Sequence, residues 1–143
     1  MGAIGVALTV TATIVGLSSQ SRLGGPNRAL GTPDPLRVLE LRAYSVNPLN
    51  PTYWEVGVDL AGCCWSDRVI HAAIHQGDVD SRGFAGYGYT DPDIELLQDG
   101  SLNPGITIKF AGYFHAGTAT ITVCDSRRCA KTDVMVPEAQ PAP

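Results

Sequence analysis

Apolar and polar residues alternate with a period of two along several stretches, and this pattern limits the fold more than any other feature of the chain. The clearest example is residues 53–61, YWEVGVDLA, and the pattern recurs at 106–110, 118–124 and 132–136. In residues 53–61 the apolar side consists of Trp54, Val56, Val58 and Leu60. Successive side chains of a β-strand point to opposite faces, so each stretch predicts a half-buried antiparallel strand. We therefore expect an all-β fold.

Glycine and proline occur often enough to break the chain into short segments. The 143 residues, the length of one domain, include 16 glycines and 10 prolines, a density typical of β-sandwiches and not of long helices. Charged residues make up only 17%, against ~25% in an average soluble domain, which suggests extra surface buried against other copies. The net charge of −4, with no basic cluster larger than Arg127-Arg128, disfavours a nucleic-acid partner.

Composition divides the chain into four parts. Residues 1–20 are apolar and contain no ionisable side chain, and residues 21–35 form a Gly/Pro linker. Residues 36–137 read as the folded β-sandwich domain, and residues 138–143 form a flexible polar tail rich in proline.

Two segments, residues 34–46 and 67–75, can be read as helix or strand, and the spacing of Val69, Ile70 and Ile74 favours a strand in the second. Residues 34–46 could form a helix that begins at Asp34, or a strand that directs Leu39, Leu41 and Ala43 to one side. We favour the strand because the neighbouring segments are strands. Residues 90–105 predict a loop with at most one helical turn.

Residues 116–136, AGTATITVCDSRRCAKTDVMV, resemble the last hairpin of an immunoglobulin-like sandwich. The resemblance implies an antiparallel immunoglobulin-like β-sandwich of the kind found in extracellular modules. Because such sandwiches serve adhesion, binding and polymer formation alike, it implies no catalytic residue.

The four cysteines predict disulfides and an oxidising compartment, in preference to free thiols or a metal site. Antibody-type domains carry a disulfide across the core, but Cys124 shares its side of the strand with threonines and so faces away from the apolar side. The turn 125–128 places Cys124 opposite Cys129, where a cross-strand bridge is possible and would contribute about 2 kcal/mol. For Cys63 and Cys64 three states remain open: a bond to each other, two free thiols, or bonds to a second molecule.

Candidate metal ligands are few, and we expect neither a metal nor a cofactor. His71 and His75 share a face of a predicted strand at a spacing of ~13 Å, which is too far for one ion. Asp91, Asp93 and Glu95 are spaced like the start of a calcium loop, yet the glycine and the final glutamate of an EF-hand are missing. Solvated acids in a turn are the preferred interpretation, with a loop-bound calcium as the alternative.

Motifs for catalysis are missing from the sequence. The chain contains no GxSxG, and residues 83–91, GFAGYGYTD, lack the lysine of a phosphate-binding loop. These residues predict a mobile loop or an aromatic contact surface. We expect that the protein is not an enzyme.

The apolar stretch 5–17, GVALTVTATIVGL, admits three interpretations. A signal peptide usually has a basic start, a membrane helix needs ~20 apolar residues, and pilins typically keep a glutamate at position 5. A strand fits better, because β-branched residues favour extended chain and threonines alternate with apolar residues. The apolar side of that strand would be Val6, Leu8, Val10, Ala12 and Ile14.

These observations lead to a hypothesis of an extracellular structural subunit that assembles with itself into a pilus-like filament or surface layer. Residues 5–17 would add as a strand to the sheet of a neighbouring subunit. The alternative is a secreted or membrane-anchored binding module whose residues 1–20 are a signal or a membrane anchor.

Overall fold

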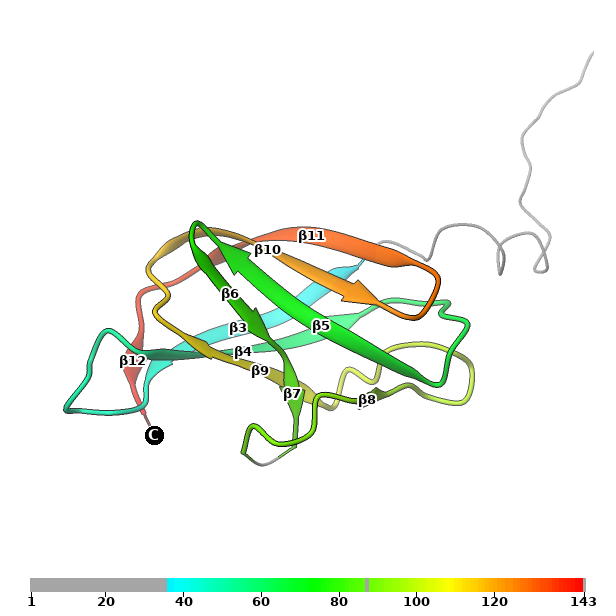
Figure 1. Cartoon of the computed structure of the whole chain (residues 1–143), viewed down its shortest axis with the longest axis horizontal. Coiled ribbons are helices and arrows are strands. Elements are labelled where there is room, and N and C mark those ends of the chain that lie inside the picture. The colour runs from blue at the N-terminus through cyan, green and yellow to red at the C-terminus, as the bar shows by residue number, and fades with distance from the viewer. Residues whose placement is uncertain (1–35, 87, 143) are drawn as a thin grey trace, which may run out of the picture. The chain divides into compact units, whose positions relative to one another are not determined.

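Two β-sheets face each other in the computed structural model, which describes residues 36–86 and 88–142 (Figure 1). The β10 sheet has the spatial order β11 (Cys129–Val136), β10 (Gly117–Cys124), β5 (Val69–Gln76) and β6 (Val79–Arg82), and β8 (Ile94–Glu95) pairs with β5. The β4 sheet has the order β12 (Gln140–Pro141), β3 (Arg37–Ser45), β4 (Trp54–Ala61), β9 (Thr107–Gly112) and β7 (Phe84–Ala85). All pairs are antiparallel except β12 with β3. The described residues form no helix, and the all-β prediction is confirmed.

The period-two alternation of the sequence produces the core between the sheets. In β4 the predicted apolar side, Trp54 through Leu60, is buried, and in β10 Ala119, Ile121 and Val123 face the same interior. Burying a large aliphatic or aromatic side chain contributes about 1.5–3 kcal/mol, so these two strands anchor the domain. The largest fully buried side chains are Phe110, Leu60, Ile70, Ile74, Ile121, Val56, Val58, Val123 and Val136.

Strand β3 confirms the strand interpretation of residues 34–46 from Arg37 onward, but one predicted core position is wrong. Pairing with β4 shifts between Val38 and Glu40, so that Leu39 is an extra residue in a β-bulge. The bulge reverses the alternation, and Leu39 is 49% exposed while Val38 packs against the core.

The chain crosses from the β10 sheet to the β4 sheet at Gly83, between β6 and β7. The Gly83 N–H donates to the carbonyl of Ala72 at 2.7 Å. A Cβ placed on Gly83 would lie 2.7 Å from Ile108 Cγ2 and 2.8 Å from Phe110 Cε1. Only a residue without a side chain fits at this crossing.

The remaining segments are short. In the stretch 90–105, the two residues of β8 replace the helical turn that the sequence allowed, and Ile94 is buried. In the predicted tail 138–143, Gln140 and Pro141 form β12 beside β3. The predicted segments 1–20 and 21–35 lie outside the described residues.

Candidate functional site

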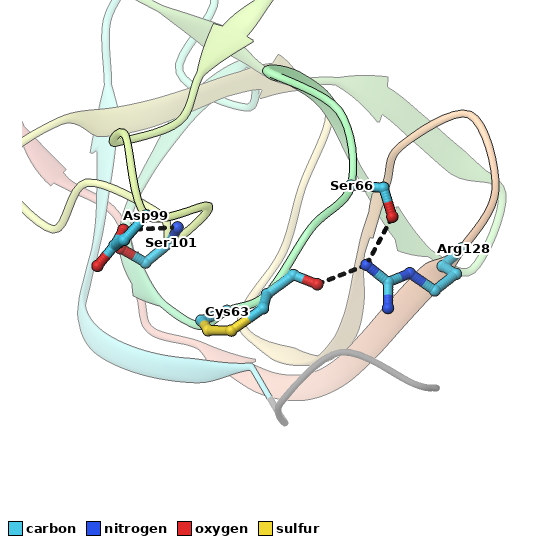
Figure 2. Close-up of a disulfide and its surroundings, with 6 residues drawn as sticks. Cys63, Ser66, Asp99, Ser101 and Arg128 are labelled. Atoms are coloured by element: carbon cyan, nitrogen blue, oxygen red, sulfur yellow. Dashed lines mark hydrogen bonds between the residues drawn. A yellow bond between two sulfur atoms is a disulfide. The ribbon is translucent and has the colours of Figure 1, made fainter. Parts of the chain in front are cut away.

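Three connections meet at one end of the two sheets and form what we call the loop end. They are the β4–β5 connection (62–68), the segment between β8 and β9 (96–106) and the β10–β11 turn (125–128). The first two are joined by backbone hydrogen bonds from Trp65 N to Gly100 O at 3.1 Å and from Leu102 N to Gly62 O at 2.8 Å. Within 96–106, Ser101 donates to the carboxylate of Asp99 (Figure 2).

Two aspartates join the β4–β5 connection to the β10–β11 turn in a reciprocal manner. The carboxylate of Asp125 accepts from Ser66 N at 2.9 Å and from Arg127 N and Arg128 N at 2.8 Å each. Asp67 Oδ2 accepts from Ser126 N at 2.8 Å in the opposite direction. Partial burial acts to raise the pKa of Asp125, but the backbone N–H donors outweigh it, so the pKa lies below its ordinary value.

Arg128 holds the same two connections together through its side chain. Its guanidinium donates to the carbonyl of Cys64 and to Ser66 Oγ, the latter at 3.1 Å (Figure 2). The structure bonds the sulfurs of Cys63 and Cys64 to each other beside this contact. The contacts that hold these two connections together are therefore made by charged and polar groups.

Across the β10–β11 hairpin, Cys124 pairs with Cys129 with their Cα atoms 4.1 Å apart. Both cysteine pairs lie at disulfide distance, and no described cysteine is free.

Beside the loop end lies an open hollow of about 370 Å³. Its lining comes from the β4–β5 connection, the start of β5, the residue before β8 and the β10–β11 turn, and it comprises Asp67, Arg68, Val69, His71, Asp93, Asp125 and Ser126. Carboxylates, a guanidinium and an imidazole line the hollow, so its chemistry suits a small polar or charged ligand.

Each of the two predicted histidines contacts an aspartate, and for His71 that aspartate is the predicted acid Asp93. His71 and His75 share the exposed face of β5, as expected for a strand. His71 Nε2 is 2.8 Å from Asp93 Oδ1, and His75 Nδ1 is 2.5 Å from Asp80 Oδ1. Asp91 accepts the backbone N–H of Asp93.

A wider groove of about 870 Å³ contains Asp91, Asp93 and Glu95 in its lining, together with Lys109. No group of three or more His, Cys, Asp or Glu in residues 36–86 and 88–142 is placed to hold a metal ion.

In the aromatic segment 83–91, Tyr89 contacts three other side chains. The Tyr89 hydroxyl donates to the carboxylate of Glu55, and the Tyr89 ring meets Phe84 edge to face at a centroid distance of 5.8 Å. Lys109 Nζ lies 5.6 Å from the centre of the same ring. Burial, followed by the hydrogen bond to Glu55, raises the pKa of Tyr89.

The outer edge of β11 is the second feature with a capacity to bind. Asp125 N donates to Arg128 O at 2.9 Å, which makes 125 and 128 a hydrogen-bonded pair. Antiparallel pairs alternate, so 124 and 129 form a non-bonded pair, in agreement with their short Cα separation. By the same alternation, Lys131, Asp133 and Met135 direct their N–H and C=O groups away from β10. No strand among the described residues pairs with that edge.

Gln76 is a buried polar residue that sequence reasoning missed. Its side chain is 2% exposed, donates to His115 O at 2.8 Å and accepts from His115 N at 2.9 Å. It follows Ile70, Ala72 and Ile74 on the inward side of β5, and this alternation was the signal that could have identified it. Asp125 likewise stands at the first position of a four-residue turn, where aspartate is favoured.

The residues of the predicted assembly strand, Val6, Leu8, Val10, Ala12 and Ile14, lie outside the described residues. The expected membrane contact through residues 1–20 lies outside them as well. In the part of the chain that the structure describes, no helix has the length and apolar character needed to cross a bilayer.

Comparison with known protein families, with curated proteins and with solved structures found no match for this chain.

Proposed function

We propose that the protein is an extracellular structural subunit that assembles with copies of itself. Residues 5–17 add as a strand to the sheet of a neighbouring subunit, and head-to-tail repetition of that contact produces a filament or surface layer. The role needs no catalytic residue and no cofactor.

The observation that carries this proposal is the outer edge of β11, with which no other described strand pairs. An eight-residue strand in unbroken register with β10 presents backbone N–H and C=O groups with no partner among the described residues. Such an edge is a template for pairing with another chain. The apolar, threonine-alternating segment 5–17 supplies a strand of matching chemistry, tethered by a Gly/Pro linker.

We further propose that the domain is an immunoglobulin-like sandwich. The support is its strand order, β3-β4-β9-β7 in one sheet and β11-β10-β5-β6 in the other, which corresponds to the ABED and GFCC′ arrangement. The domain differs from antibody domains in that β4 and β10, the strands that would carry the cross-core disulfide, are not bridged. Cysteines at disulfide distance support an oxidising, extracellular location.

The test is the native size of the full-length protein, measured by light scattering together with a peptide map of its N-terminus. We expect polymers that retain residues 1–20. The variant Val10→Pro should abolish them, because proline in the middle of a strand removes a ladder hydrogen bond. Ala29→Pro, in a linker that already contains prolines, is the control and should assemble normally. A monomer that begins near Ser18 to Arg22 would refute the filament.

A secreted binding module is the second candidate, and the loop end favours it. There, two connections joined by Asp125, Asp67 and Arg128 border a hollow with charged side chains in its lining, an arrangement that suits ligand recognition. A monomeric mature protein lacking residues 1–20 would favour this candidate over the structural subunit.

A further inference from the structure

The described domain has four sheet edges, and they differ in their capacity to accept another strand. The edge of β3 is interrupted by the bulge at Leu39 and is covered by β12 at Tyr44 and Ser45. The strands at the other edges of the two sheets, β6 and β7, are four and two residues long. The edge of β11 extends over eight residues with no bulge.

We propose that the outer edge of β11 is the acceptor for residues 5–17 of a second copy of this chain. This inference rests on the proposed function and assigns its docking surface. The hydrogen bonds would be made by the outward backbone groups of Lys131, Asp133 and Met135, whose side chains point to solvent.

The two faces of β11 match the two faces of the segment. On the inner face, Val134 and Val136 are buried, and β3 lies across from β11 with the partly buried Val38 and Leu41. An added strand that turns its valine- and leucine-bearing side inward would extend this apolar layer over the margin of β3.

On the outer face, β10 carries alternating threonines, and Thr120 Oγ1 donates to Asp133 Oδ1 at 2.8 Å. The threonine side of residues 5–17 would continue this polar, β-branched face. The alternation of the segment therefore suits this edge when its apolar side faces inward.

Lengths are compatible with docking between copies. The edge of β11 is roughly 26 Å long at ~3.3 Å per residue, and the thirteen residues 5–17 exceed it. Residues 18–35 separate the segment from the described domain, and a flexible chain of that length spans roughly 20–25 Å on average. Its extended reach is about 60 Å, which is enough to bridge two neighbouring domains.

The experiment uses the full-length protein and the substitution Lys131→Pro. This proline removes an outward N–H and leaves the β10 ladder intact, so the domain should fold, which near-UV circular dichroism verifies. Lys131→Ala removes the same charge and keeps the N–H, so it is the matched control. We expect Lys131→Pro to prevent assembly and Lys131→Ala to preserve it.

Hydrogen–deuterium exchange in the unsubstituted protein provides a readout that does not depend on folding of the variant. The amides of Lys131, Asp133 and Met135 should exchange at least about tenfold more slowly in the assembled protein than in Val10→Pro. If Val10→Pro blocks assembly while Lys131→Pro assembles and these amides stay unprotected, the acceptor edge is wrong and the proposed function stands.

Two further outcomes overturn the inference in other ways. If the unsubstituted protein does not assemble and the three amides are unprotected, the proposed function itself fails. If the protein is monomeric and the amides are protected, the segment covers the edge of its own chain and docking between copies is refuted.

Discussion

At the scale of single residues, Asp125 accepts hydrogen bonds both within its own four-residue turn and from a separate connection. One carboxylate oxygen caps the turn and the other fixes Ser66 of a separate connection. Hydrogen bonds to a charged group contribute about 1.5–3 kcal/mol each when they are shielded, and less where water competes. The residue therefore couples the geometry of the hairpin to that of the Cys63–Cys64 segment.

Asp125→Asn should lower the free energy of unfolding at pH 7 by about 1–2 kcal/mol, after allowance for partial exposure. The amide retains one oxygen acceptor but loses the charge and offers an N–H group where an acceptor is needed. Urea denaturation measures the change. Asp78→Asn is the control, since Asp78 is exposed in the β5–β6 turn and makes no side-chain hydrogen bond that the structure shows, and it should shift stability by less than about 0.5 kcal/mol.

The same substitution has an expected pH dependence. The pKa of Asp125 is lower in the folded protein than its ordinary value of 3.8, so the unfolded chain takes up the proton first as the pH falls. The stabilisation is complete above that ordinary value and is lost as the pH falls through the folded pKa. The difference in stability between the unsubstituted protein and the Asp125→Asn variant should stay constant from pH 7 to about pH 5 and shrink below about pH 4. An equal difference at neutral pH and well below the ordinary pKa would show that the charge does not matter.

For single residues, the sequence allowed predictions only about relations between positions that lie close together in the chain. Cys124 opposite Cys129 followed from a turn of four residues, a relation confined to neighbouring positions. The contact between Asp125 and Ser66 joins residues 59 positions apart, and nothing in either local sequence specifies the other. The loop end was therefore missed, because its bonds depend on how two sheets are stacked.

At the scale of elements, the alternation predicted the strands that build the core because burial on one face imposes it. Residues 54–60 show this directly, with the apolar side inward throughout β4. The prediction was wrong at Leu39, where an extra residue reverses the sides of β3. A bulge depends on the partner strand, so periodicity within one strand does not reveal it.

The crossing at Gly83 gives an element-scale prediction. Gly83→Ala should destabilise the protein by about 1–3 kcal/mol, because the new methyl group would overlap the buried Ile108 and Phe110. Gly77→Ala is the comparison: its φ of +57° costs about 1 kcal/mol, but no atom lies within 4 Å of the new Cβ. Denaturant unfolding should show the larger loss for Gly83→Ala.

A double variant separates this overlap from other causes. Phe110→Leu removes the ring atom that the new methyl group would meet, so the combined variant with Gly83→Ala should lose less stability than the sum of the single losses. Strictly additive losses would show that overlap with the Phe110 ring is not the cause of the loss.

At the scale of the whole molecule, the proposed contacts and the covalent bonds have separate roles. The two sheets enclose a core within residues 36–142, and no other described strand pairs with the outer edge of β11. Each cysteine pair is closed within one chain, and the described residues hold no free thiol. Subunits joined through the β11 edge would thus be held by backbone hydrogen bonds and apolar burial alone.

This arrangement predicts that assembled protein dissolved in SDS without reductant migrates as a monomer. A tryptic map under the same conditions should contain the peptide 43–68 as a single chain, lighter than its reduced form by two hydrogen atoms, because Cys63 and Cys64 are bonded to each other. The peptide 110–127 should be linked to 129–131 through Cys124 and Cys129. Alkylation after reduction is the control, and it should separate the linked pair. Two copies of 43–68 joined to each other would instead show that Cys63 and Cys64 bridge neighbouring subunits, and the assembly would then be covalent.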